Sequence, residues 1–240
     1  MIAEKIPLPQ IDGRTVFHVL LTIAGLIGLV IIVGSIVYWQ TSGDFLDIEK
    51  TPWPLVVGSL VQTLIIVVSI EFGWRRRKGL TLRDIGFQQT SIWLLVIVAI
   101  AGFLLAGTIE GIERQLGIKP GDLVPELIAP QGFVWLHFVA VLITVGIIAP
   151  VAEEMIFRGV LYSWFRSRFN VPLAITLNAG LFGLIHLGYP LPLMALVALM
   201  GAVFAWSFER TGSLWVPIVL HIGQNSAVVI AIYATLYFQR

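Results

Sequence analysis

Long apolar runs separated by short polar segments dominate the chain. The first run, residues 16–39, is 24 residues long, and about 20 apolar residues suffice for a helix to cross the hydrocarbon core of a bilayer. Comparable runs follow at residues 54–74, 91–109, 133–166, 172–187, 191–208 and 214–238. The pattern predicts an all-α, polytopic transmembrane helical bundle of about seven membrane helices, within a range of six to eight.

Two features modify this pattern. Pro150 lies inside the fourth run, and because proline lacks a backbone N–H and clashes with the preceding turn, we expect it to kink or end the helix there. Residues 110–132, between the third and fourth runs, are acidic and rich in Gly and Pro. Such a composition is typical of a linker, with room for a short surface helix.

The composition favours a membrane location. Hydrophobic residues make up 58% of the 240 residues and charged residues 12%, whereas soluble domains carry about 25% charged residues. The sequence therefore predicts an integral membrane protein with the lipid bilayer as a partner. The net charge of +1 gives no indication of a nucleic-acid partner, and the lack of cysteine excludes disulfides and thiolate metal sites.

Basic residues are divided unequally between the two sides of the predicted bundle. With a cytoplasmic N-terminus, eleven Lys and Arg lie inside and four outside, and cytoplasmic loops normally carry the excess. The inside set is Lys5, Arg14, Arg75, Arg76, Arg77, Lys78, Arg83, Arg158, Arg166, Arg168 and Arg210, and the outside set is Lys50, Arg114, Lys119 and Arg240. We therefore expect a multi-pass protein with a cytoplasmic N-terminus, in the inner or plasma membrane if the cell is prokaryotic.

Candidate chemistry is concentrated in the fourth run, where Glu153, Glu154 and Arg158 interrupt the hydrocarbon. Residues 133–149 before them and 173–208 after them contain no Asp, Glu, Lys or Arg. Charges in such surroundings are costly, so function is their default explanation. On a helix Glu154 and Arg158 share a face and can pair, while Glu153 points about 100° away. One paired and one free carboxylate suits catalysis; the structural alternative is an ion pair with Glu153 reaching water.

Three more polar residues follow in the last third of the chain. His186 ends an uncharged run, and His221 and Asn225 are four residues apart on one helix face. Counted from the nearest basic or polar boundary residue, Glu153, His186 and His221 lie roughly 20, 24 and 16 Å deep. Helix tilt shortens each depth, so the three can share one layer and form a site that opens to the cytoplasm. This requires residues 133–166 to form one long, kinked element, which conflicts with a strict count of seven separate spans.

Three motifs occur in order in this region: Glu153-Glu154-x-x-x-Arg158, Phe182-x-x-x-His186 and His221-x-x-x-Asn225. In residue type, spacing and order they resemble the CPBP family of intramembrane proteases, which includes CAAX prenyl endopeptidases and bacteriocin-processing proteins and is also called the type II CAAX or Abi family. Residues 81–87, Thr-Leu-Arg-Asp-Ile-Gly-Phe, look like the short element that often precedes the core of this family. The resemblance covers about residues 81–229. It implies a protease core at 81–240, in the C-terminal two-thirds. The N-terminal membrane helices expected at 1–80 are not covered by any motif.

The resemblance also implies an activity. A CPBP protein would hydrolyse peptide bonds of membrane-associated or prenylated, CAAX-type substrates, and peptide hydrolysis needs an activated water, a proton donor and a group that stabilises the oxyanion. By the resemblance, Glu153 is the general base and His186 orients the water. His221 and Asn225 donate hydrogen bonds to the oxyanion, and Arg158 holds the second glutamate of the motif ionised.

Three alternatives stay open. In a metal-dependent mechanism Glu153, His186 and His221 bind Zn²⁺ and leave a position for water, but the His-Glu-x-x-His spacing of many zinc proteases is absent. We favour water activation by glutamate and histidine, which requires no cofactor. A non-catalytic membrane binding or bacteriocin-immunity protein would keep the protease fold and use its polar pocket for a ligand. A small transporter with a Glu–His relay would favour an inverted repeat, and the sequence shows none.

Overall fold

The computed structural model describes residues 8–40, 50–115, 117 and 123–239. Within these ranges the regular secondary structure is helical, without strands. Six of the described helices are long and apolar enough to cross a membrane: Gly13–Val37, Trp53–Lys78, Ile92–Gln115, Trp135–Arg166, Leu191–Thr211 and Trp215–Phe238. A shorter apolar helix spans Val171–Leu184. The prediction of an all-α polytopic bundle is confirmed, and the protein is a multi-pass integral membrane protein.

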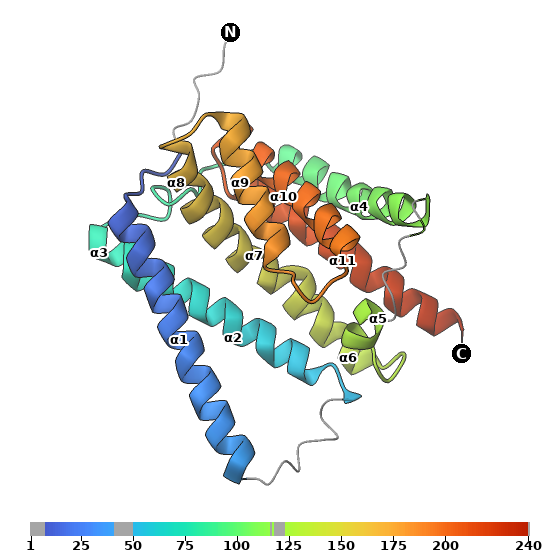
Figure 1. Ribbon diagram of the computed structural model, residues 1–240. Coiled ribbons are helices and arrows are strands. Elements are labelled where there is room, and N and C mark those ends of the chain that lie inside the picture. The colour runs from blue at the N-terminus through green and yellow to red at the C-terminus, as the bar shows by residue number, and fades with distance from the viewer. Residues whose placement is uncertain (1–7, 41–49, 116, 118–122, 240) are drawn as a thin grey trace.

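The described helices consist of α-helical (α) and π-helical (η) stretches. In chain order these are α1 (Gly13–Gln40), α2 (Trp53–Ile70), η2 (Glu71–Arg75), α3 (Arg76–Lys78), α4 (Ile92–Gln115), α5 (Leu123–Ile128), α6 (Trp135–Val141), η3 (Leu142–Ile148), α7 (Ala149–Glu154), η4 (Met155–Tyr162), α8 (Ser163–Arg166), α9 (Val171–Leu184), α10 (Leu191–Thr211) and α11 (Trp215–Phe238). The segment from α6 to α8 runs through the middle of the view in Figure 1, with α1 and α2 on one side and α4, α9, α10 and α11 on the other.

The long element expected between residues 133 and 166 is one continuous helical segment with two π-helical stretches. The helix does not end at Pro150, contrary to one of the two outcomes expected. The reason lies in the π-turn just before the proline. There the N–H of Ala149 bonds to the carbonyl of Thr144, five residues back, so the hydrogen-bond pattern is already shifted by one residue where Pro150 occurs. The conflict over the number of spans is also resolved. Among the described residues, six segments are long enough to cross a membrane, whereas α9, with 14 residues, extends only about 21 Å.

Helices α4 and α11 pack with their backbones in contact. A Cβ atom added to Gly102 of α4 would lie 2.3 Å from the carbonyl oxygen of Leu220, and one added to Gly223 of α11 would lie 2.5 Å from that of Ala99. No side chain fits at such distances, so both positions require glycine. Small residues allow this close approach of helices within membranes. The contact fixes α11, which carries two of the candidate site residues, against α4.

Helix α1 packs mainly through its first turns. Val16 and Val19 are buried in a cluster with residues of α2 and η2, and a Cβ added to Gly73 would lie 3.2 Å from a methyl group of Val19. Residues 31–37 of α1 are exposed. Figure 1 shows α1 and α2 diverging from their shared end. The exposed apolar side chains of α1 are suited to contact with lipid.

Candidate active site

The centre of the site is a buried ion pair. The side chains of Glu154 and Arg158 are both 0% exposed, and Nη1 of Arg158 lies 2.8 Å from Oε1 of Glu154. The second terminal nitrogen, Nη2, donates to the carbonyl of Gly201 on α10 at 2.8 Å. The guanidinium also lies over the ring of Phe182, 4.7 Å from its centroid. Buried charges persist when they are paired and hydrogen-bonded, so this pair holds η4 against α9 and α10.

The burial of Arg158 corrects one part of the charge count. The set of eleven inside residues includes Arg158, but its side chain is fully enclosed by protein. It therefore faces no loop and carries no information on orientation. Ten inside residues against four outside keep the same bias.

His221 of α11 is oriented by the same carboxylate. Its Nδ1 lies 2.8 Å from Oε1 of Glu154, and because a carboxylate oxygen accepts, Nδ1–H is the donor. In the neutral ring, Nε2 then carries the lone pair. The ring of Phe204 stacks on the imidazole with centroids 4.6 Å apart. The tautomer and the plane of His221 are thus both fixed by neighbours.

Glu153 faces the opposite edge of the same imidazole. Its Oε2 lies 3.9 Å from Nε2 of His221, and its side chain is 14% exposed, against 4% for His221. This separation is too long for a direct hydrogen bond but suits two groups that share one bridging molecule. The adjacent glutamates of the motif therefore occupy different positions around His221: Glu154 at Nδ1 and Glu153 beside Nε2.

His186 lies two residues beyond the end of α9, in the turn that leads to α10, rather than within a helix that extends to residue 187. Its Nδ1 lies 2.9 Å from the carbonyl oxygen of Phe182, so Nδ1–H donates and Nε2 is the second ring nitrogen. The ring of Phe182 contacts both histidines, with centroids 5.3 Å from His186 and 5.8 Å from His221. The carboxylate of Glu153 interacts electrostatically with both imidazoles.

Asn225 is engaged elsewhere. Its Nδ2 donates to the carbonyl of Val145 at 3.1 Å, and the neighbouring Ser226 Oγ donates to the carbonyl of Gly146 at 3.4 Å. A residue at position 150 would normally donate its backbone N–H to one of these carbonyls, that of Val145 five residues back or that of Gly146 four residues back. Pro150 has no N–H to donate. Among the described residues, the side-chain partner of Asn225 is therefore this carbonyl rather than another member of the predicted set.

The arrangement does not support the zinc alternative. Among the described residues, no group of three or more His, Cys, Asp or Glu side chains is placed to hold a metal ion. The predicted ligands Glu153 and His221 are adjacent, but His186 does not complete a three-ligand cluster with them. The metalloprotease interpretation gains no support from this geometry.

Two polar residues near the site, Tyr189 and Asn178, were not among the predicted candidates. The ring of Tyr189 lies 5.5 Å from that of His186, and its hydroxyl interacts electrostatically with Glu153. Asn178 of α9 is fully buried and donates to the carbonyl of Phe157 at 2.8 Å. The sequence held a signal for each, since both are polar residues within eight positions of His186 in an otherwise apolar segment.

Comparisons with known proteins agree with this picture. A model of the family described as "Type II CAAX prenyl endopeptidase Rce1-like" matches residues 135–227, a range that contains all six candidate residues. The protein "Putative membrane peptidase YdiL" of Bacillus subtilis (strain 168) is 31% identical over 180 residues, which are 74% of this chain and 70% of that protein. An "Uncharacterized 24.3 kDa protein" of Escherichia coli is 33% identical over 146 residues, 59% of this chain and 62% of that protein. No solved structure matches the chain.

Proposed function

The chain belongs to the CPBP family of intramembrane proteases, and from this premise we propose that it hydrolyses peptide bonds with a water molecule activated by Glu153 and His186. The observation that carries the proposal is the position of His221 between two carboxylates. Glu154, itself held by Arg158, fixes Nδ1 at 2.8 Å, and Glu153 lies 3.9 Å from Nε2. A purely structural ion pair does not account for a second glutamate on the open side of the histidine.

In the proposed reaction Glu153 is the general base. Its carboxylate takes a proton from water while the water oxygen attacks the carbonyl carbon of the scissile peptide bond. Nε2 of His186, free to accept because Nδ1 donates to Phe182, orients the same water. The proton held by Glu153 then passes to the leaving amine as the C–N bond breaks, which returns the carboxylate to its starting state.

The oxyanion needs hydrogen-bond donors, and we assign this role to His221. Because its Nδ1–H already donates to Glu154, Nε2 donates only when both ring nitrogens carry protons. Glu154 holds the ring in position through Nδ1, and Arg158 keeps Glu154 in place. For Asn225 we propose a positioning role instead, since its amide is bound to the carbonyl of Val145.

The proposed substrates are membrane-associated peptides, including prenylated, CAAX-type C-termini. The family description names CAAX prenyl endopeptidases, and the site lies inside a set of membrane-spanning helices. With the N-terminus in the cytoplasm, as the distribution of basic residues favours, the site is expected to open toward the cytoplasmic side. The division into residues 1–80 and 81–240 stays a prediction.

The test is cleavage of quenched membrane peptides, including farnesylated C-terminal peptides, by the detergent-purified protein. Glu153→Gln keeps the shape of the side chain and removes the base, so kcat is expected to fall about 100-fold or more. The matched control is Glu209→Gln, which changes another buried glutamate, one that accepts from Tyr162 at 3.0 Å and Arg166 at 3.1 Å. It should leave kcat within a few-fold.

Each outcome discriminates between the interpretations. Equal activity of the Glu153→Gln and Glu209→Gln variants would remove Glu153 from the mechanism. Loss of activity with a chelator and rescue by zinc would assign the protein to the metal-dependent class. No cleavage of any peptide by the wild-type protein, together with ligand-dependent stabilisation that His221→Gln abolishes and His137→Gln retains, would favour the binding or immunity protein.

A further inference from the structure

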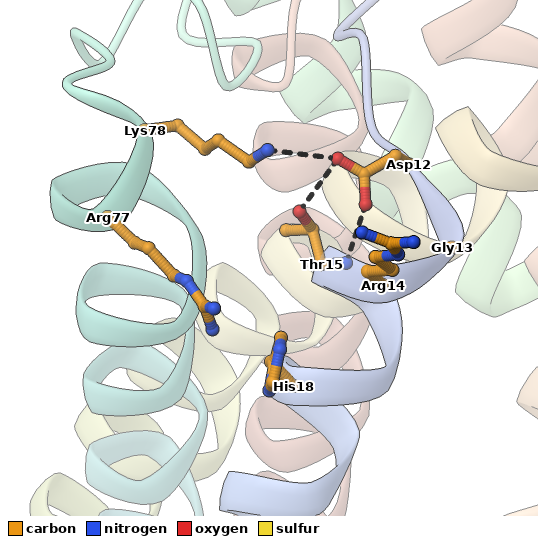
Figure 2. Close-up of a pocket in the computed structure, with 7 residues that line it drawn as sticks. All are labelled: Asp12, Gly13, Arg14, Thr15, His18, Arg77 and Lys78. Atoms are coloured by element: carbon orange, nitrogen blue, oxygen red, sulfur yellow. Dashed lines mark hydrogen bonds and ion pairs between the residues drawn. The ribbon is translucent and has the colours of Figure 1, made fainter.

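A polar cavity lies far along the chain from the proposed catalytic residues. It has a volume of about 720 Å³ and opens between the start of α1 and the end of the segment formed by α2, η2 and α3. Figure 2 shows its lining residues, Asp12, Gly13, Arg14, Thr15, His18, Arg77 and Lys78. None of them belongs to the proposed catalytic set.

The cavity carries excess positive charge. Three cations, Arg14, Arg77 and Lys78, face one carboxylate, that of Asp12. This carboxylate is already engaged: it accepts from the N–H of Thr15 at 2.8 Å, from the hydroxyl of Thr15 at 3.1 Å, and pairs with Lys78 Nζ at 3.1 Å. It satisfies the N-terminal turn of α1 and one of the three cations.

The two arginines are left uncompensated. In the part of the chain that the structure describes, neither Arg14 nor Arg77 makes an ion pair or a side-chain hydrogen bond. Figure 2 shows the guanidinium of Arg77 and the ring of His18 directed into the same space between the two helices. Guanidinium groups present paired N–H donors that match phosphate oxygens. The cavity therefore offers unused donors for a phosphate group.

The position of the cavity is suited to a membrane lipid as its ligand. It lies at the ends of two membrane spans, Gly13–Val37 and Trp53–Lys78. Just below it on these spans, Phe17 is 62% exposed and Phe72 57% exposed. A molecule with its phosphate in the cavity would have apolar side chains beside it along the membrane. Basic pockets between transmembrane helices on the cytoplasmic side bind anionic lipid headgroups, and this end carries the basic residues predicted to be cytoplasmic.

We propose that the cavity between α1 and α3 binds the phosphate of an anionic phospholipid headgroup through Arg14 and Arg77, with the acyl chains lying against the exposed apolar surface of α1 and η2. Lys78 stays paired with Asp12 and borders the site. The same N–H donors would also bind free inorganic phosphate. The adjoining apolar surface favours the lipid, which gains hydrophobic contacts that a free anion lacks.

The test compares lipid binding by the detergent-purified full chain. Phosphatidylglycerol, phosphatidylcholine and inorganic phosphate are added separately, and bound lipid is counted by native mass spectrometry alongside the thermal unfolding midpoint. Phosphatidylglycerol is expected to bind and raise the midpoint, while phosphatidylcholine and phosphate do not. A basic residue beside an anionic lipid contributes about a fivefold factor in binding, so Arg14→Ala with Arg77→Ala should weaken phosphatidylglycerol binding about 30-fold.

The control pair is Arg83→Ala with Arg210→Ala, which removes the same charge from exposed positions outside the cavity and should stay within threefold of wild type. An equal loss of phosphatidylglycerol binding in the two double variants would mean that net charge alone causes the effect, and it would overturn the proposed site. Phosphatidylcholine binding as tight as phosphatidylglycerol would overturn the anionic headgroup. Stabilisation by inorganic phosphate equal to that by the lipid would overturn the lipid assignment. If the alanine pair does not fold, Arg14→Gln with Arg77→Gln gives the same comparison.

Discussion

Glu154 is the residue through which the other side chains of the site are placed. One of its oxygens, Oε1, accepts from both Arg158 and His221 at 2.8 Å. All three residues are buried. The carboxylate charge is tolerated in a membrane helix because the guanidinium compensates it. Loss of either partner therefore affects both the stability of the fold and the orientation of the histidine.

Replacing Arg158 by methionine should show this dependence. Arg158→Met leaves the charge of Glu154 buried and unpaired, which is expected to lower the free energy of unfolding by about 3–5 kcal/mol. Denaturant titration in mixed micelles measures this value. The control is Glu154→Gln combined with Arg158→Met, in which no charge is left unpaired, so it should be less destabilised than the sum of the single variants. Strict additivity would show that the pair contributes nothing as a unit.

Asp12 gives a pH-dependent contribution outside the membrane spans. Hydrogen bonds from Thr15 and the nearby Lys78 lower the pKa of this carboxyl from 3.8 to about 2. Because the pKa in the folded state is lower than in the unfolded state, the contribution is fully present above pH 4 and is lost as the pH falls from about 4 to 2. Asp12→Asn should therefore unfold more easily than wild type at neutral pH, and the two midpoints should converge below pH 3. A difference that is constant from pH 7 to 2 would contradict this account.

At the scale of elements, Pro150 and the amide of Asn225 form a matched pair. The proline lacks the N–H that would reach the carbonyls of Val145 and Gly146, and α11 supplies Asn225 and Ser226 to them instead. A helix defect in one segment thus holds a second helix in register. This explains why a long segment with a proline stays continuous beside Glu153 and Glu154.

A double-mutant cycle tests this pairing. Asn225→Ala should cost about 1 kcal/mol of stability because it leaves the partly buried carbonyl of Val145 without its side-chain donor. With Pro150→Ala an N–H is available again, so the cost of Asn225→Ala should shrink. The free energy of unfolding of all four proteins measures the coupling. An undiminished cost in the Pro150→Ala background, accompanied by an equal loss of kcat in both backgrounds, would return Asn225 to the oxyanion role.

The α4–α11 contact makes another prediction. Gly223→Ala places a methyl group 2.5 Å from the carbonyl oxygen of Ala99. Overpacking of this kind costs about 1–3 kcal/mol of stability. Gly107→Ala in α4 is the control, because a Cβ there meets nothing within 4 Å and alanine is the better helix former. The thermal midpoint should fall for Gly223→Ala and stay level or rise for Gly107→Ala. Equal midpoints would mean that the two helices separate without penalty.

For the whole molecule, the distribution of basic residues predicts its orientation in the membrane, with the N-terminus in the cytoplasm. Since the chain has no cysteine, single cysteines can report on it. With a cytoplasmic N-terminus, Arg83→Cys is expected to react with a membrane-impermeant thiol reagent only after the cells are opened, and Gln131→Cys in intact cells. Both residues are exposed. The reverse pattern would invert the predicted topology.

The long apolar helices could be predicted from the sequence because the bilayer sets their length, whereas the depth of the site stays a prediction. Apolar runs located the helices, and isolated polar residues located Glu153, Glu154, Arg158, His186 and His221. The direction of each side chain could not be predicted. The contact of Glu154 with His221 depends on the rotation of η4 against α11, and on π-turns that leave no mark in hydropathy. The partner of Asn225 could in principle have been predicted, because a proline at position 150 leaves the carbonyls of Val145 and Gly146 without its N–H as a donor.

The glycine contact between α4 and α11 has a consequence for how a peptide enters. Where two backbones touch, the helices cannot part without breaking the contact, so this side of the bundle is a closed wall. The turn that carries His186 lies elsewhere and is loosely covered, with Leu187 75% and Leu191 77% exposed. A peptide therefore cannot enter between α4 and α11, and it has to reach Glu153 and His186 from another side of the bundle.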